Sequence, residues 1–367
     1  MDTPRSLLLG FDALSPHEQS TLVPTESTAK PALSPEQRRC LSAEAHQWLK
    51  QGIAQYRQGQ YTPALAILQQ ALQAYRSLGH RSGEAKVLLT LASLYYQLAD
   101  YLWALDYARQ SLTVARKLKD QHLIQQSLSY LGNSYRHLKD LDRALTYTQE
   151  SLQFARILAD RPAEMRSLNN LAMVYRLRGQ NQEAAELYEA SLLIAMDLGD
   201  GPTVEQVLKN LGNTYSALGN HLKTIQYYEQ LLSLASKSQL QAPLDPQLPM
   251  RILRSLSLAY RAMGNHVRAI AYLHQRLTIV RRHNDARSEE QILEQLAQSY
   301  EITDQVEAAL DCYEQRLQVL IQLQDRQLQR QAFNHFRCAC LSHGVIERTR
   351  PYQSLFEARS PSDSPHL

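Results

Sequence analysis

Residues 131–135 read Leu-Gly-Asn-Ser-Tyr, and related versions of this stretch return at a fixed interval along the chain. Forty residues later the sequence reads Leu-Ala-Met-Val-Tyr at 171–175, and forty beyond that it reads Leu-Gly-Asn-Thr-Tyr at 211–215. Further copies lie at 91–95, 256–260 and 296–300. A fixed interval of this length indicates a repeat architecture in which every repeat is one supersecondary unit.

A small residue keeps the same interval in the second half of each unit. Turn signals such as Arg178-Gly179-Gln180 precede it, and glycine there suits the left-handed end of a helix. In the first half, Leu128, Leu131 and Tyr135 share one helical face. Each unit is therefore predicted to be helix, tight turn, helix, and stacked units would bury the apolar faces. The small residues are Ala64, Ala104, Ala144, Ala184, Thr224, Ala269 and Ala309.

The repeats predict an all-α fold, a right-handed superhelix (α-solenoid) of about seven helical hairpins plus a C-terminal capping helix. A proline-rich loop at 241–249 lengthens one interval, and Ser34-Pro35-Glu36 has the pattern of a helix start. We expect a disordered N-terminal tail at 1–33, a solenoid at 34–345 and a flexible C-terminal tail at 346–367. The expected units lie near 46–85, 86–125, 126–165, 166–205, 206–250, 251–290 and 291–324, with the cap at 325–345.

Composition and the absence of known motifs reduce the classes of function to be considered. Lys plus Arg number 39 and Asp plus Glu 36, a net charge of +3, which is too small to indicate nucleic-acid or membrane binding by itself. Four cysteines are too few for a disulfide framework, and no apolar run is long enough for a membrane span, so we expect a cytoplasmic protein. The sequence contains no phosphate-binding glycine loop, nucleophile elbow or His-Glu-x-x-His motif, so we expect neither catalysis nor a cofactor.

The pattern Leu-Gly-x-x-Tyr, then Gly-Asn or Gly-Gln, then Ala resembles the tetratricopeptide repeat over about residues 44–345. With its 40-residue interval, the repeat resembles the subgroup of tetratricopeptide repeats found in spindle-orientation adaptors, G-protein-signalling modulators and kinesin light chains. Stretches that carry this resemblance are 167–171, 210–215 and the links Leu198-Gly199-Asp200 and Lys119-Asp120. It implies recognition of a peptide or protein on the concave surface, without intrinsic catalysis. Such repeats serve many partners, so the resemblance alone names none.

One second-helix position departs from the pattern late in the chain. It is Ser111, Ser151 or Ser191 in the early units, but Arg276 and Arg316 in the last two. Packing at these two positions must either open towards solvent or bury an arginine stem.

One stripe of the first helices is expected to line the concave groove. From the second to the sixth unit this stripe holds eight basic residues and no acidic one, and arginine suits carboxylates. We therefore expect an acidic peptide or protein segment in this groove. The alternative is that these arginines are only solvated, or are paired with carboxylates such as Glu84, Glu164 or Glu205. The candidate groove residues are Lys86, Tyr96, Asn133, Arg136, Arg166, Asn169, Met173, Arg176, Lys209, Asn213, Arg251, Arg254 and Arg261.

Three other interpretations stay open: a zinc site, RNA binding and a peptide sensor. His335, Cys338, Cys340 and His343 suggest zinc, but their spacing matches no common site, and the cysteines suit the cap better. Twenty tyrosines among many arginines could stack on RNA, although most of them fall on repeat positions that the core requires. A regulatory sensor that binds a short signalling peptide is the third alternative. The sequence does not indicate the oligomeric state.

Overall fold

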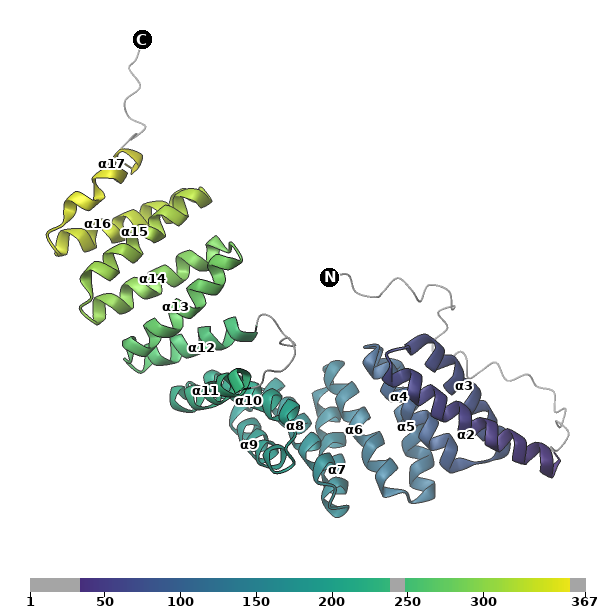
Figure 1. Cartoon of the computed structure of the whole chain (residues 1–367). Coiled ribbons are helices and arrows are strands. Elements are labelled where there is room, and N and C mark those ends of the chain that lie inside the picture. Colours follow the sequence, from purple (N-terminus) through teal and green to yellow (C-terminus); the bar gives the residue numbers. More distant parts are fainter. Residues whose placement is uncertain (1–33, 238–247, 357–367) are drawn as a thin grey trace, which may run out of the picture. The chain divides into compact units, whose positions relative to one another are not determined.

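The computed structural model describes residues 34–237 and 248–356, and the regular structure in these ranges is entirely helical (Figure 1). The chain divides into two compact units, Met1–Gly201 and Pro202–Leu367. The expected tail at 1–33, most of the proline-rich loop and residues 357–367 lie outside the described residues.

The first unit contains four helical hairpins. Each first helix packs on the second helix of its own hairpin, and α4 also contacts α6, the first helix of the next hairpin. The helices are α2 (Pro35–Arg57), α3 (Tyr61–Leu78), α4 (Arg81–Gln97), α5 (Tyr101–Leu118), α6 (Gln121–His137), α7 (Leu141–Ile157), α8 (Arg161–Leu177) and α9 (Asn181–Asp197).

The second unit continues the same pattern, and α10 begins at its boundary. The helices are α10 (Gly201–Ala217), α11 (His221–Lys237), α12 (Leu248–Ala262), α13 (His266–Arg282), α14 (Ala286–Ile302), α15 (Val306–Leu323), α16 (Arg326–Ser342), the 3₁₀ helix η1 (Ile346–Thr349) and α17 (Arg350–Phe356). The predicted all-α array of repeated hairpins with a C-terminal cap is confirmed, with α2–α15 forming the hairpins.

Where the connection between two α-helices is described, the helix ends follow one rule in both units. A residue with positive φ ends a helix, and a capping residue follows it directly and begins the next helix. Gly179 and Gly264 take this conformation with φ of 81° and 75°, as predicted, but Ala99 and Lys139 adopt it too, with φ of 59° and 63°. The next residue is often aspartate, and Asp120 accepts a hydrogen bond from the Leu123 amide at 3.1 Å.

These caps move the hairpin boundaries. The third unit was expected to begin near Gln126, but its first helix begins at Gln121, directly after its cap. The helix start expected at Ser34-Pro35-Glu36 begins the first helix of unit one itself, α2, with a capping box between Ser34 and Gln37. The apolar repeat marks the buried turn of each helix, whereas the cap sets its beginning.

The small residue of each second helix is buried where the two helices of a hairpin meet. Of the seven, Ala309 has the largest exposed fraction, 2%. A stacked pair of tyrosines also recurs in the hairpins. The repeat tyrosine of the first helix stacks on a tyrosine of the second helix. Ring centroids lie 5.4 to 5.7 Å apart in the pairs Tyr95–Tyr107, Tyr135–Tyr147, Tyr215–Tyr227 and Tyr260–Tyr272.

Arg276 and Arg316 bury their stems rather than opening the packing. Their exposed fractions are 5% and 4%. In the early units the same position holds serines that bridge neighbouring helices, as in the 2.9 Å hydrogen bond from Ser127 to Ser111. Of the two arrangements that the sequence allowed, opening towards solvent or burial of the arginine stem, the structure has the second.

The cap is longer than the sequence indicated. Phe333, Phe336 and Cys340 of α16 are buried, which fits a capping helix. Residues 346–356, which we expected to belong to the tail, form η1 and α17 and pack beside α16. Thr349 is completely buried in η1, at the interval expected for a small residue of a second helix.

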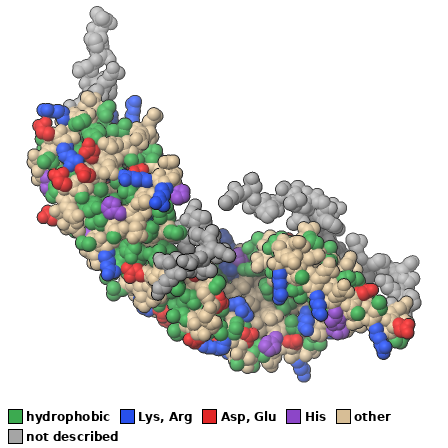
Figure 2. All heavy atoms as spheres, in the orientation of Figure 1, with side chains coloured by type: hydrophobic (Ala, Val, Ile, Leu, Met, Phe, Trp, Pro, Cys, Tyr) green, Lys and Arg blue, Asp and Glu red, His purple; other side chains and the backbone are tan. Residues whose placement is uncertain are grey.

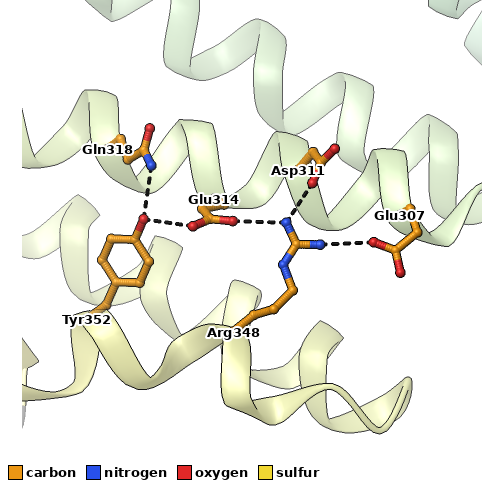
Figure 3. A network of polar contacts seen from close by, with 6 residues as sticks. All are labelled: Glu307, Asp311, Glu314, Gln318, Arg348 and Tyr352. Atoms are coloured by element: carbon orange, nitrogen blue, oxygen red, sulfur yellow. Dashed lines mark hydrogen bonds and ion pairs between the residues drawn. The ribbon is translucent and has the colours of Figure 1, made fainter.

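Polar contacts fasten this added segment to α15 (Figure 3). The Arg348 guanidinium lies 3.1 Å from Glu307, 2.6 Å from Asp311 and 2.9 Å from Glu314, while the Tyr352 hydroxyl donates to Glu314 at 2.9 Å. All three carboxylates come from one face of α15, more than thirty residues earlier in the chain, so local sequence could not reveal this segment.

Gly212 provides a test of the close helix contact. A Cβ atom at this position would lie 2.6 Å from the ring of Tyr228, whereas one at Gly201 of the same helix would meet nothing within 4 Å. We expect Gly212→Ala to lower the free energy of unfolding by about 1–3 kcal/mol through overpacking. Gly201→Ala should change it by no more than about 1 kcal/mol. Urea denaturation followed by circular dichroism measures both, and equal effects would contradict the packing described here.

Candidate functional site

The predicted groove residues all lie on first helices, and each is partly or fully exposed. In the first unit they belong to α4, α6 and α8, and we call them the first-unit face: Lys86, Tyr96, Asn133, Arg136, Arg166, Asn169, Met173 and Arg176. In the second unit they belong to α10 and α12, and we call them the second-unit face: Lys209, Asn213, Arg251, Arg254 and Arg261.

A ladder of hydroxyl groups joins three consecutive first helices beside the first-unit face. Tyr130 of α6 donates to Ser93 Oγ of α4 at 2.7 Å, and Tyr56 of α2 shares a 2.8 Å hydrogen bond with the same oxygen. Both contacts span 37 residues of sequence. One serine thus holds the spacing of α2, α4 and α6.

Tyr96 and Arg136 meet directly on this face. The Tyr96 hydroxyl lies 3.0 Å from Nε2 of His137 and 3.4 Å from Nη2 of Arg136. The His137 ring stacks on Tyr101 with centroids 4.3 Å apart. Two predicted residues are therefore brought together with two neighbours, Tyr101 and His137, that were not predicted.

Burial sets the ionisation of this cluster. It raises the pKa of Tyr96 and of Tyr130, although the charge of Arg136 opposes the shift at Tyr96. Burial and the neighbouring Arg136 both lower the pKa of His137. At neutral pH the tyrosines are therefore neutral hydrogen-bond donors, and the positive charge of the cluster belongs to Arg136.

Arg136 and Arg176 also approach one buried hydroxyl. Burial raises the pKa of Tyr188, and the charges of Arg176 and Arg136 act against it. Nε of Arg136 is buried and has no hydrogen-bond partner within the described part of the chain. Two guanidinium groups from neighbouring helices thus converge beside a neutral tyrosine.

The second-unit face is built in a similar way. The Tyr228 hydroxyl donates to Oδ1 of Asn213 at 2.8 Å, and the charge of Arg251 acts on the same hydroxyl. Arg261 donates to Gln298 at 2.7 Å. The oxygen of Asn213 is thus already engaged inside the fold, and only its amide N–H groups would be offered to a partner.

The basic residues of both faces differ in their surroundings from the arginines that form ion pairs. Several arginines of second helices bind carboxylates, as Arg116 does with Glu150 at 2.8 Å and Arg281 with Glu289 at 2.7 Å. Across residues 34–237 and 248–356, no ion pair involves any basic residue of the two faces.

Two of the carboxylates considered as competing partners are engaged elsewhere. Glu84 binds Arg76 and Arg81, at 3.1 and 2.8 Å. Glu164 binds Arg156 and Arg161 in the same arrangement, at 3.0 and 3.3 Å. Neither compensates the charges of the first-unit face.

The zinc alternative gains no support from the described residues. Cys340 is buried in α16, whereas His335, Cys338 and His343 are exposed, and no three histidine, cysteine or acidic side chains in the described ranges are arranged to hold a metal. In the same ranges no helix combines the length and apolar character of a membrane span.

Sequence reasoning assigned the predicted groove residues to first helices but missed the contacts among their neighbours. Ser93, Tyr56 and Tyr130 were not among the candidate groove residues. The equal spacing of 37 residues between these three was a usable signal. The pairing of Tyr101 with His137 left no such signal, because it depends on side-chain direction across two helices.

The hydroxyl ladder can be tested at its centre. Ser93→Ala removes the shared partner of two tyrosine hydroxyls, so we expect the free energy of unfolding to fall by about 1–3 kcal/mol. Ser129→Ala on α6, at a half-buried serine, serves as control and should change it by about 0.5 kcal/mol or less. Chemical denaturation measures both. If Ser93→Ala leaves the free energy of unfolding unchanged, the hydroxyl ladder does not stabilise the fold.

Comparisons with known proteins agree with the repeat. The tetratricopeptide repeat family matches residues 43–117, 123–197 and 165–237, together more than half of the chain, and a second tetratricopeptide repeat description matches 252–287. Among curated proteins, no sequence matches this chain significantly.

Solved structures share the fold at low sequence identity. Aspartyl phosphate phosphatase F from Bacillus subtilis is 16% identical over 77% of this chain and 71% of its own, with a TM-score of 0.52. The apo form of RapI is 14% identical over 77% and 99%, with a TM-score of 0.51.

A third structure is a signal transduction ATPase with numerous domains from Pyrococcus horikoshii, which carries a tetratricopeptide repeat sensor. It is 18% identical over 81% of this chain and 45% of its own, with a TM-score of 0.52. At these identities the structures show a common fold and nothing further. On the family match and the repeated hairpins together, the chain belongs to the tetratricopeptide repeat family.

Proposed function

We propose that this chain is a cytoplasmic interaction scaffold, or adaptor, that binds an acidic segment of a partner protein in a groove lined by its first helices. The observation that carries the proposal is the contrast in ion pairing. Second-helix arginines such as Arg116 and Arg281 are neutralised within the chain, whereas the basic residues of the two faces have no carboxylate partner in the described ranges.

The chemistry of the first-unit face fits such a segment. Arg166 and Arg176 are exposed guanidinium groups that can bind carboxylates in a bidentate way. Met173 lies between them on α8 and offers apolar contact, while Asn133 on α6 can bond to an extended peptide backbone. Tyr96 adds a neutral aromatic surface. Together these groups favour a peptide with acidic and apolar side chains.

A nucleic-acid partner is less well supported. Figure 2 shows basic side chains as separate spots among apolar and neutral polar side chains on the face that is drawn, and not as one continuous patch. Binding to a phosphate backbone relies on several phosphates neutralised in a row. The separated charges suit single carboxylates better.

A peptide-responsive regulatory sensor is the second candidate. Its support is the structural neighbour from P. horikoshii, whose repeats are described as a sensor. The two candidates share the same face and differ in what binding causes. A sensor would change its compactness when the peptide binds, which small-angle X-ray scattering measures. We propose no catalytic step, although one structural neighbour is described as a phosphatase, because that similarity concerns the fold.

The proposal is tested by measuring how a variant with reversed charges on the first-unit face binds the partner. Partners are captured from native lysate, identified by mass spectrometry, and their acidic segment is then titrated calorimetrically. Arg166→Glu with Arg176→Glu should weaken binding by about tenfold or more, because two carboxylates would face the acidic segment. Binding by the wild type should also weaken as salt is raised.

The control has the same change in charge on second helices: Lys117→Glu with Arg282→Glu, two exposed positions of α5 and α13. It should bind as the wild type does. If both double variants bind equally well, the first-unit face is not the binding site.

A further inference from the structure

The buried arginines of the last hairpins differ in one respect. Arg276 of α13 and Arg316 of α15 occupy the same repeat position, and their exposed fractions are 5% and 4%. A buried guanidinium requires a counter-charge, because an unpaired charge away from water is costly. Only one of the two has it within the described residues.

Arg316 binds two carboxylates of α14, the first helix of its own hairpin. Its Nε donates to Glu290 at 3.1 Å, and its Nη1 lies 2.9 Å from Oε1 of Glu294. The exposed fraction of the Glu290 side chain is 7%, so the pair is almost completely removed from water. The chain therefore shows directly which chemical group fits a guanidinium at this position.

One repeat earlier, the same two positions hold no carboxylate. Forty residues before Glu290 and Glu294 stand Met250 and Arg254, both on α12. Nε and Nη1 of Arg276 are buried without a hydrogen-bond partner in the described ranges. Burial lowers the pKa of Arg276, and the charge of Arg254 lowers it further. Two guanidinium groups thus lie near each other where the next hairpin has an arginine and two glutamates.

Asp285 is a described carboxylate whose charge raises the pKa of Arg276, and it is engaged elsewhere. Its side chain caps α14 by accepting from the Ser288 amide at 3.1 Å. No ion pair joins it to Arg276 among the residues that the structure describes. It moderates the charge without occupying the place of Glu290 or Glu294.

We propose that Arg254 and Arg276 form a carboxylate subsite of the second-unit face, filled by a carboxylate of the bound partner segment. Arg254 is exposed and meets the incoming anion, while Arg276 supplies the buried guanidinium that lacks a counter-charge. The identity of the ligand rests on the function proposed above. The carboxylate comes from an acidic side chain or from the C-terminus of the partner.

The first experiment needs no partner. Arg254→Glu places a carboxylate where Glu294 stands in the next hairpin, so it should pair with Arg276. We expect the melting temperature to rise by about 2–4 °C relative to Arg254→Gln, which removes the same charge without adding a carboxylate. The gain should vanish in an Arg276→Met background, since methionine fills the space without charge. If Arg254→Glu is no more stable than Arg254→Gln, or if the gain survives without Arg276, the subsite is refuted.

The chain itself could supply the carboxylate. Asp245 is the one acidic residue of segment 238–247, which lies outside the described residues. Asp245→Asn should leave the melting temperature of the wild type unchanged. A loss of stability that disappears in the Arg276→Met background would assign the subsite to Asp245 and overturn the proposal.

The second experiment follows the Arg276 Nε–H signal by nuclear magnetic resonance, assigned by its absence in Arg276→Met. Two small probes are titrated at constant ionic strength: N-acetylglutamate α-amide carries a side-chain carboxylate, and N-acetylglycine carries a terminal one. A saturable shift that is lost in Arg254→Glu supports the subsite, and the tighter probe identifies the source. No shift with either probe overturns it.

These readouts are independent of the first-unit face. Arg166→Glu with Arg176→Glu leaves Arg254 and Arg276 in place, so the proposed function can fail while the probes still bind. Conversely, a partner that depends on Arg166 and Arg176 with no probe shift at Arg276 would keep the function and reject the subsite.

Discussion

The close contact of two helices at one small residue per hairpin is the constraint on which the structure depends. Ala104 and Ala144 are completely buried at this contact, and their neighbours are placed by it. A larger side chain would separate the helices and break the stacked tyrosine pairs beside them. Because the contact recurs at the repeat interval, hairpins of one unit can stack in the same way, and each contributes its first helix to a common face.

This regularity makes the departures from it informative. The buried position that holds Ser111, Ser151 and Ser191 accepts arginine in α13 and α15 without opening to solvent. At Arg316 the cost of burial is offset by Glu290 and Glu294. The same repeat at Arg276 lacks both carboxylates, so two hairpins with nearly the same packing differ in electrostatics. Repeat proteins allow such a comparison because one hairpin serves as the reference for its neighbour.

The faces formed by the first helices are held together by neutral groups rather than by ion pairs. Ser93, Tyr56 and Tyr130 fix the spacing of three helices through hydroxyl groups, and burial raises the pKa of Tyr130. The second helices, by contrast, are joined by salt bridges such as Arg116–Glu150. This division leaves positive charge uncompensated on the first helices α4, α6, α8, α10 and α12, which is where a partner of opposite charge would bind.

Much of the fold was readable from sequence. The 40-residue interval, the apolar period of the first helices and the small residue of the second determined the hairpins, because each reports a local preference or a contact repeated many times. The basic residues could be assigned to the first helices for the same reason. The beginnings of the helices were harder to predict, since aspartate caps lie ahead of the apolar pattern. The helical segment 346–356 was not predicted, because Arg348 is held there by carboxylates from α15.

Only the tertiary structure decided which charges are neutralised. The partner of Arg116 lies 34 residues away on another helix, and those of Arg348 lie on α15. The sequence offered Glu84 and Glu164 as partners for the face, but side-chain direction assigns them to Arg76, Arg81, Arg156 and Arg161. Sequence alone determines the helices and their repeat, because these depend on neighbours along the chain. Compensation of charge depends on distances of a few ångströms between helices, and packing alone sets those distances.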